Sequence, residues 1–258
     1  MPEVEYGLQD GVARITINRP ERRNAMSFDV MQLLCDALDR VAGDDAARVV
    51  VLTGAGERAF CAGADLGSIG SDTSVIEAHR KRGLLADVFR QLWKLEKPSI
   101  ARVRGFALAG GFGLAMACDF AIASSDAQFG TPEIDVGLWP YMITVPLLRS
   151  MPQRLVLELM ATGRRVDADE AARIGFVNRV VPPDLLDDTV DDFASALASK
   201  SPLILGMGKQ SFYRALEMSS DDALDYLQTM LTITTLSADT AEGIAAFMEK
   251  RPPQWRGQ

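Results

Sequence analysis

Two glycine-rich stretches are the first places where this sequence could carry chemistry. They are FCAGADL at residues 60–66 and ALAGGFG at residues 107–113, and each follows residues typical of a buried strand. Small residues let another molecule approach the backbone, and free N–H groups at a turn or helix start attract an anionic oxygen. Two such turns on adjacent strands could aim two N–H groups at one oxygen and form an oxyanion hole. Tight packing of a helix on a sheet would account for the same glycines.

The elements that position these turns alternate between strand-like and helix-like segments. Residues 12–20 alternate as in a half-buried strand and stop at Pro20. Ser27 suits the N-cap of a helix within residues 28–44, which we expect Gly43 to end. The β-branched run at residues 48–54 is typical of a strand buried on both faces. Further strands are expected in three segments: residues 98–105, 119–125 and 176–182.

Helices are expected to dominate after residue 150. Residues 153–163 are amphipathic, and residues 167–175 begin with a capping box formed by Asp167 and Glu170. From Pro182 onward the chain reads as helices separated by short polar breaks. A strand, a glycine turn, a helix and a strand in succession indicate an α/β crossover. We therefore expect an α/β core over residues 1–200 and a helical C-terminal region over residues 201–258.

Composition excludes several classes of function. The chain has 258 residues, of which 48% are hydrophobic and 24% charged, as in a soluble globular protein. The formal charge of −8 disfavours binding to nucleic acid or to an anionic membrane surface. Three cysteines without CxxC spacing favour a reducing compartment. An acidic, polar N-terminus and the lack of a long apolar run predict a cytoplasmic protein without a membrane span.

Three apparent motifs are set aside. Residues 54–59 (GAGERA) match a dinucleotide-binding pattern, but the glycines and turn formers that follow argue against the helix which that site requires. His79 is the only histidine and lies in a charged helix start, so we expect a solvated residue and no metal site. Cys61 is expected to be a small buried filler.

Five segments resemble the enoyl-CoA hydratase/isomerase, or crotonase, superfamily. They occur in family order over nearly the whole chain: NRPERRNAMS (18–27), AFCAGADL (59–66), GFALAGGFGLAMACDFAIAS (105–124), FGTPEIDVGL (129–138) and EGIAAFMEKRPPQW (242–255). The resemblance implies a spiral of ββα units, a C-terminal helical region that forms a homotrimer or a dimer of trimers, and an acyl-CoA thioester as substrate. It implies no cofactor other than the coenzyme A that the substrate carries.

The resemblance also assigns residues to the site. It implies that the backbone amides of Ala64 and Gly110 hold the thioester oxygen, where charge develops when the neighbouring carbon loses a proton. Cations at Arg22, Arg23, Lys250 and Arg251 would attract the nucleotide end of CoA. The implied substrate contacts are Arg22, Arg23, Ala25, Ala62, Asp65, Leu66, Gly111, Trp139, Phe247 and Lys250, and no metal ligand is implied.

The pattern breaks at one catalytic position. Hydratases of this family use two glutamates, because one water must be held and deprotonated while a proton is delivered to carbon. Glu133 stands at the second of these positions, but Gly113 stands at the first. Three interpretations remain: Glu133 alone moves a proton between two carbons, Asp135 on the same face supplies the second carboxylate, or the protein binds acyl-CoA with little turnover. We favour the first. Trp139 and Tyr141 could narrow the acyl pocket, or Tyr141 could act as a donor, but packing is the expected role for both.

Overall fold

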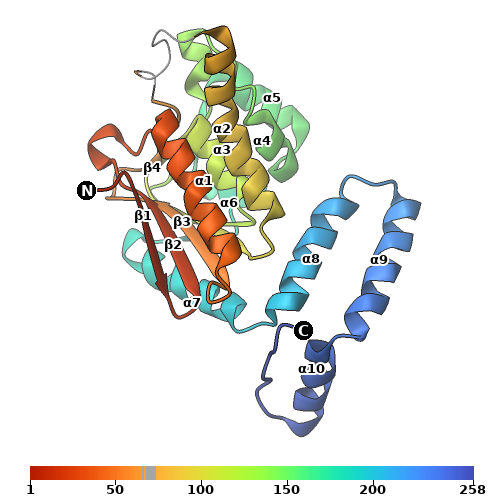
Figure 1. The fold of residues 1–258 in the computed structure, drawn as a ribbon. Helices are drawn as coiled ribbons and strands as arrows, with labels where there is room; N and C mark the ends of the chain where they lie inside the picture. The colour runs from red at the N-terminus through yellow and green to blue at the C-terminus, as the bar shows by residue number, and fades with distance from the viewer. Residues whose placement is uncertain (66, 68–73) are drawn as a thin grey trace.

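The computed structural model describes residues 1–65, 67 and 74–258, and in this part the chain forms two sheets covered by helices (Figure 1). The larger sheet has six strands in the order β1-β2-β3-β5-β7-β10. Its first two strands form an antiparallel hairpin, and the other pairs are parallel. The strands are β1 Val4–Gln9, β2 Val12–Ile17, β3 Val49–Gly54, β5 Ser99–Val103, β7 Phe120–Ser124 and β10 Arg179–Val181.

A smaller sheet carries both glycine turns. Its four strands have the order β4-β6-β8-β9, with β9 antiparallel to β8 and the other pairs parallel. Each has three residues: β4 Ala59–Cys61, β6 Phe106–Leu108, β8 Gln128–Gly130 and β9 Arg165–Asp167. The strand β6 ends directly before the second glycine turn and β4 directly before the first. Since these strands are parallel neighbours, both turns emerge at the same edge of the sheet.

Strands and helices repeat as units of two strands and a helix. The first unit is β1, β2 and α1 (Phe28–Gly43), the second is β3, β4 and α2 (Val75–Lys94), and the third is β5, β6 and α3 (Gly110–Ala117). In the second and third units one strand joins each sheet. This arrangement confirms the expected ββα spiral, although the sequence shows no clean repeat.

The remaining helices follow the strands β8 to β10. A 3₁₀ helix, Pro132–Val136, leads from β8 towards α4 and α5. The capping box is half formed, because Asp167 accepts a hydrogen bond from the Glu170 amide (2.8 Å) while the Glu170 carboxylate pairs with Arg164. The helices are α4 Thr144–Ser150, α5 Gln153–Thr162, α6 Ala168–Ile174, α7 Leu186–Ala198, α8 Pro202–Ala215, α9 Ser220–Thr235 and α10 Ala238–Glu249.

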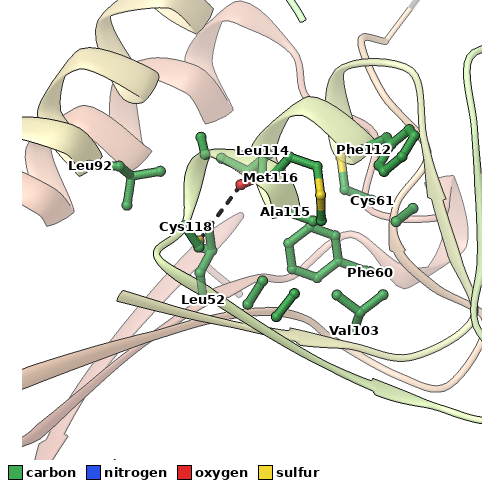
Figure 2. Close-up of a cluster of buried hydrophobic side chains, with 14 of the residues drawn as sticks. Leu52, Phe60, Cys61, Leu92, Val103, Phe112, Leu114, Ala115, Met116 and Cys118 are labelled. Atoms are coloured by element: carbon green, nitrogen blue, oxygen red, sulfur yellow. Dashed lines mark hydrogen bonds between the residues drawn. The ribbon is translucent and has the colours of Figure 1, made fainter. Parts of the chain in front are cut away.

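The core lies on both faces of the larger sheet. Leu52 faces a cluster shared with α1, α2 and α3, part of which Figure 2 shows, while Val49 and Val51 face α7. Successive residues of a strand point to opposite faces, so the β-branched run of β3 is buried throughout, as its sequence predicts. Cys61 and Cys118 lie in the first cluster as buried thiols, and burial raises the pKa of Cys61 to about 12.

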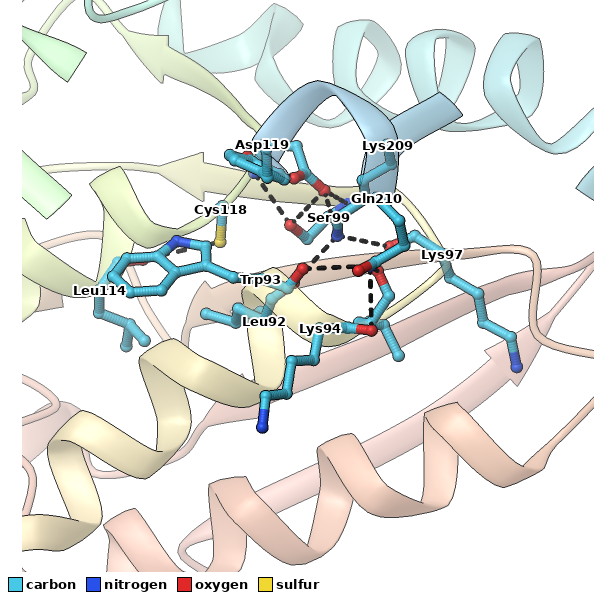
Figure 3. Close-up of polar contacts among 12 residues, drawn as sticks. Leu92, Trp93, Lys94, Lys97, Ser99, Leu114, Cys118, Asp119, Lys209 and Gln210 are labelled. Carbon is cyan, nitrogen blue, oxygen red and sulfur yellow. Dashed lines mark hydrogen bonds and ion pairs between the residues drawn. The ribbon is translucent and has the colours of Figure 1, made fainter. Parts of the chain in front are cut away.

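A buried polar network anchors the C-terminal helices to this core (Figure 3). Lys209 of α8 pairs with Asp119 (2.8 Å) and donates to the carbonyl of Leu92 (2.9 Å), in the last turn of α2. Asp119 also accepts hydrogen bonds from Tyr213 (2.7 Å) and from the amide of Ser99 (2.7 Å). The helix α8 is therefore fixed both to the sheet and to α2.

Candidate active site

The first glycine turn follows β4 and is held against the segment before α1. The amide of Met26 donates to the carbonyl of Gly63 (2.8 Å), and the amide of Asp65 donates to the carbonyl of Met26 (2.8 Å). Gly63 has φ +100°, and a β-carbon added there would lie 2.6 Å from the Cβ of Ala109. A side chain at residue 63 is therefore excluded, and the two glycine turns touch at this point.

The second turn is fixed by an alanine in an unusual conformation. Ala109 has φ 51° and ψ −128°, a region that a non-glycine residue rarely occupies. Its amide donates to the carbonyl of Gly130 (2.9 Å), while its own carbonyl accepts from the amides of Phe112 (2.9 Å) and Gly113 (3.1 Å). Because a trans peptide is planar, the N–H of Gly110 points opposite to that carbonyl, away from α3.

Two backbone amides consequently lie close together without acceptors. Within residues 1–65, 67 and 74–258, neither the Ala64 nor the Gly110 amide donates a hydrogen bond. A β-carbon added at Gly110 would lie 3.7 Å from the Ala64 nitrogen. Both amides belong to the turns that the sequence singled out, and a negatively charged oxygen between them would be stabilised by two donors.

The neighbouring glycines serve packing. A β-carbon at Gly111 would lie 2.1 Å from the carbonyl oxygen of Cys61, so α3 can approach β4 only with glycine at this position. A β-carbon at Gly113 would lie 2.4 Å from Cγ2 of Ile143. Packing therefore accounts for Gly111 and Gly113, whereas the amide of Gly110 is available to a ligand.

Glu133 lies in the 3₁₀ helix that follows β8. This turn is held to α5 by Thr131, whose hydroxyl donates to the carbonyl of Leu159 (2.8 Å). The Oε2 atom of Glu133 is buried and has no hydrogen-bond partner among the described residues. Burial raises the pKa of this carboxyl group from 4.5 to about 7. A carboxyl group with this pKa can accept and return a proton near neutral pH.

Asp135 does not share the face of Glu133. A strand would place residues two apart on one face, but residues 132–136 form a 3₁₀ helix, in which residues two apart differ by about 240° in direction. Asp135 is exposed, and a β-carbon added at Gly163 would lie 3.0 Å from its Oδ2 atom. The expectation that Asp135 lies on the same face is wrong, because it assumed an extended segment.

The arginines before α1 are paired with Asp65. This carboxylate lies 3.0 Å from Nη1 of Arg22 and 3.1 Å from Nη2 of the buried Arg19. Burial alone would raise the pKa of Asp65, but hydrogen bonds from Arg22, from the Gly67 amide and from Arg19 hold it below its usual range. Arg22 itself is exposed, so its guanidinium remains accessible at the edge of the first turn.

The structure brings most of the other expected contacts to the same place. The carbonyl of Arg23 accepts a hydrogen bond from the Ala62 amide (3.0 Å), and the carbonyl of Ala25 accepts one from Arg19 (2.7 Å). Leu66 lies outside the described residues. Sequence reasoning missed Arg19, because no pattern distinguishes it from the adjacent surface arginines before it folds against Asp65.

Phe247 and Lys250 lie elsewhere. Both are exposed and belong to the end of α10, which contacts α8 and α9 and lies well below the strands and helices of the site in Figure 1. Within a single chain, these two residues therefore do not lie near the glycine turns.

Three further expectations concern single side chains. Trp139 packs against the main core, as expected. Tyr141 is 77% exposed, so the expected packing role is wrong for this residue, whose side chain points into solvent. His79 is exposed on α2, as expected.

Two cavities of the molecule lie away from the candidate site. A cavity of about 410 Å³ lies between Pro20 and Ala59, and one of about 330 Å³ lies between Trp93 and Tyr213, but Glu133, Ala64 and Gly110 line neither. Across the described ranges no group of three or more His, Cys, Asp or Glu side chains could hold a metal ion. None of the helices in that part of the chain is long and apolar enough to cross a membrane.

Known proteins match this chain over nearly its full length. The family model described as Enoyl-CoA hydratase/isomerase matches residues 7–258. The short-chain-enoyl-CoA hydratase of Clostridium acetobutylicum is 39% identical over 242 residues, which cover 93% of this chain and 92% of that protein. The 2,3-dehydroadipyl-CoA hydratase of Escherichia coli is 34% identical, with all of both chains covered.

Solved structures of enoyl-CoA hydratases have a similar fold. The crystal structure of an enoyl-CoA hydratase from Mycobacterium smegmatis superposes with a TM-score of 0.94 at 36% identity, covering 99% of each chain. An enoyl-CoA hydratase from Bacillus anthracis gives the same TM-score at 31% identity, with full coverage of both chains. On the match of the family model, these identities and the shared ββα architecture, the chain belongs to the enoyl-CoA hydratase/isomerase family of enzymes.

Proposed function

We propose that this enzyme acts on an acyl-CoA thioester and holds the thioester oxygen between the amides of Ala64 and Gly110. The observation that carries the proposal is the pair of adjacent N–H groups without acceptors in the described chain. Charge develops on that oxygen only when an enolate forms, either because the neighbouring carbon loses a proton or because water adds to the double bond. Donors already aimed at the oxygen therefore stabilise the transition state more than the ground state.

Glu133 is the acid–base group in this proposal. Its carboxylate removes a proton from the carbon next to the thioester of a 3-enoyl-CoA, and the electrons spread through the dienolate to the oxygen between the two amides. The carboxylic acid then returns the same proton to the fourth carbon, which moves the double bond into conjugation. Burial raises the pKa of Glu133 to about 7, so both protonation states are accessible near neutral pH.

One carboxylate is enough for this proton transfer but not for efficient hydration. Hydration needs one group for the water and one for the carbon. Position 113 offers no side chain, and the exposed Asp135 faces Gly163. We therefore favour isomerisation of an enoyl-CoA over its hydration.

Hydration is the second candidate function, and the names of relatives favour it. The Clostridium and Escherichia relatives are both named as hydratases. An acyl-CoA-binding protein with little turnover is a third possibility, which assays can separate from both.

The nucleotide end of the substrate requires cations, and Arg22 and Arg23 supply them beside the first turn. Phe247 and Lys250 reach such a ligand only if α10 of a second copy lies over the site. The proposal accordingly includes a homotrimer or a dimer of trimers, with coenzyme A present only as part of the substrate. A cytoplasmic location stays a prediction.

Three assays with the unmodified protein test this function. Calorimetry should show tighter binding of an acyl-CoA thioester than of free CoA, because only the thioester oxygen reaches the two amides. A 3-enoyl-CoA should be isomerised faster than crotonyl-CoA is hydrated. Hydration of crotonyl-CoA with kcat/KM at or above about 10⁶ M⁻¹s⁻¹ would establish the second candidate instead. Binding without either turnover would identify the third.

A further inference from the structure

The space beside Gly113 is filled by an isoleucine. A β-carbon added at Gly113 would lie 2.4 Å from Cγ2 and 2.7 Å from Cβ of Ile143, and 3.1 Å from Cζ of Phe89. Ile143 is only 3% exposed. Glycine at residue 113 is thus matched by a buried side chain that occupies the room which a larger residue would need.

This isoleucine lies close to the candidate oxyanion hole. Residues 110 and 113 are three apart on α3 and lie on the same face of the helix, about one turn from each other. A β-carbon at Gly110 would contact Met26 (3.3 Å) and Leu85 (3.4 Å). The side chains that meet this face of α3 at Gly110 and Gly113 are therefore apolar.

The segment that carries Ile143 also carries Glu133. The amide of Leu138 donates to the carbonyl of Glu133 (3.0 Å), and the carbonyl of Ile143 accepts from the amide of Leu147 (3.1 Å) in α4. Residues 133 to 143 thus run from the carboxylate to the isoleucine as one connection between β8 and α4. Contact of Ile143 with α3 fixes the end of this connection.

We propose that Ile143 is a specificity-determining residue, which occupies the place of a second acid–base side chain on α3 and excludes water beside the acyl group. This inference rests on the proposed function, since it explains why Glu133 would act alone. With apolar atoms beside residue 113, no water is held there for addition to the double bond. The enolate is then reprotonated on carbon by Glu133.

A larger residue at position 113 should therefore be tolerated only when Ile143 is replaced by a smaller one. In Gly113→Glu alone the new side chain collides with Ile143, and overpacking in a buried site is destabilising. Ile143→Ala leaves a β-carbon 2.7 Å from the new one, so Ile143→Gly is the change that removes this clash. Phe89, whose Cζ lies 3.1 Å from the new β-carbon, then needs only a small shift. The double variant Gly113→Glu/Ile143→Gly gives α3 a carboxylate with room beside it.

The experiment compares the unmodified protein, the two single variants and the double variant by thermal unfolding, acyl-CoA binding, isomerisation and hydration. Gly113→Glu should lower Tm by about 5 °C or more, and Ile143→Gly should recover part of that loss in the double variant. The double variant should hydrate crotonyl-CoA at least tenfold faster than the unmodified protein. Ile122→Gly removes an equally buried isoleucine on the α7 side of the sheet, so combined with Gly113→Glu it should recover nothing.

If Gly113→Glu does not fold, Gly113→Ala can replace it in the stability test. Its single methyl group already collides with Ile143, so it should also lower Tm. A Gly113→Ala protein as stable as the unmodified one would overturn the pairing. A folded double variant that binds acyl-CoA but gains no hydration would overturn the role in specificity. Efficient hydration by the unmodified protein would refute isomerisation by Glu133 alone. The Tm values of the four proteins would still show whether residues 113 and 143 are coupled.

Discussion

Glu133 has one carboxylate oxygen buried without a partner in the described chain, and burial raises its pKa to about 7. Since a base must be ionised, we expect kcat/KM for proton transfer to rise with pH and to level off above about pH 7. Glu133→Gln keeps the shape and removes the base, so turnover should be lost while acyl-CoA binding stays nearly unchanged. A pH–rate profile and calorimetry on the variant measure both effects. A pH-independent rate between pH 5 and 9 would contradict the assignment.

The same group predicts how stability depends on pH. An acid with a raised pKa in the folded state favours folding below its unfolded pKa of 4.5, and that contribution is lost as pH rises to about 7. Glu133→Gln should therefore be more stable than the unmodified protein at pH 8, by about 1–2 kcal/mol after allowance for screening by water, and not at pH 4. Urea unfolding at both pH values measures the difference. Equal differences at the two pH values would contradict the raised pKa.

The strained backbone of Ala109 should lower the stability of the folded protein. Its φ of 51° with ψ −128° costs an alanine about 1–3 kcal/mol, whereas glycine adopts this conformation readily. Ala109→Gly should therefore stabilise the protein by about 0.5–2 kcal/mol in thermal unfolding. Ala107→Gly, in the preceding strand β6, should destabilise it, since that buried position carries no such strain. Destabilisation by Ala109→Gly would show that the alanine methyl contributes more than its conformation costs.

The sequence pointed to both glycine turns but not to the side chains around them. Ala64 and Gly110 lie in glycine-rich stretches that come shortly after the predicted strands at residues 48–54 and 98–105, so the turns that carry them were predictable. Ile143 is one apolar residue among many, and only the path of the connection from β8 to α4 brings it against Gly113. The sequence analysis misplaced Asp135, because residues two apart share a face in a strand but not in a 3₁₀ helix.

Among the elements, long strands and capped helices were predictable because each satisfies a local rule. Ser27 accepts a hydrogen bond from the Val30 amide (3.2 Å), and α1 ends at Gly43 as its sequence indicates. The hairpin strand β1 and all four strands of the smaller sheet were not predicted. Three residues are too few to show a period of two, so those strands are defined by their neighbours.

The contact of α8 with the core gives a prediction about one buried pair. Lys209 and Asp119 are 7% and 9% exposed, and removing the cation leaves the carboxylate buried without its charge partner. Lys209→Met should therefore cost about 3–5 kcal/mol in urea unfolding. Adding Asp119→Asn should cost less than the sum of the single changes, because the uncompensated charge is gone. Lys94→Met, which removes an exposed lysine from α2, should change stability by less than about 0.5 kcal/mol.

For the whole molecule, the C-terminal helices expose more apolar surface than their own contacts cover. The helix α9 has no buried residue, and Figure 1 shows it separated from the α/β body by α8. Its exposed leucines are Leu224, Leu227 and Leu231, with Leu236 at the C-cap. A boundary between a core over residues 1–200 and an oligomerisation region over residues 201–258 is consistent with this distribution and stays a prediction.

Assembly should therefore depend on α9. We expect light scattering to give a trimer or hexamer for the unmodified protein, because copies that meet through these helices bury their leucines. Leu227→Asp/Leu231→Asp places two charges on that face and should yield smaller species at the same concentration. Leu33→Asp, which changes a leucine of α1 as exposed as Leu227, should leave the assembly intact.

If Phe247 of a second copy covers the ligand, the α9 variant should also lose affinity for acyl-CoA. Phe247→Ala should lose that affinity while the oligomer stays intact. A monomer over a wide concentration range would rule out this arrangement, and Phe247 would then have no access to the site.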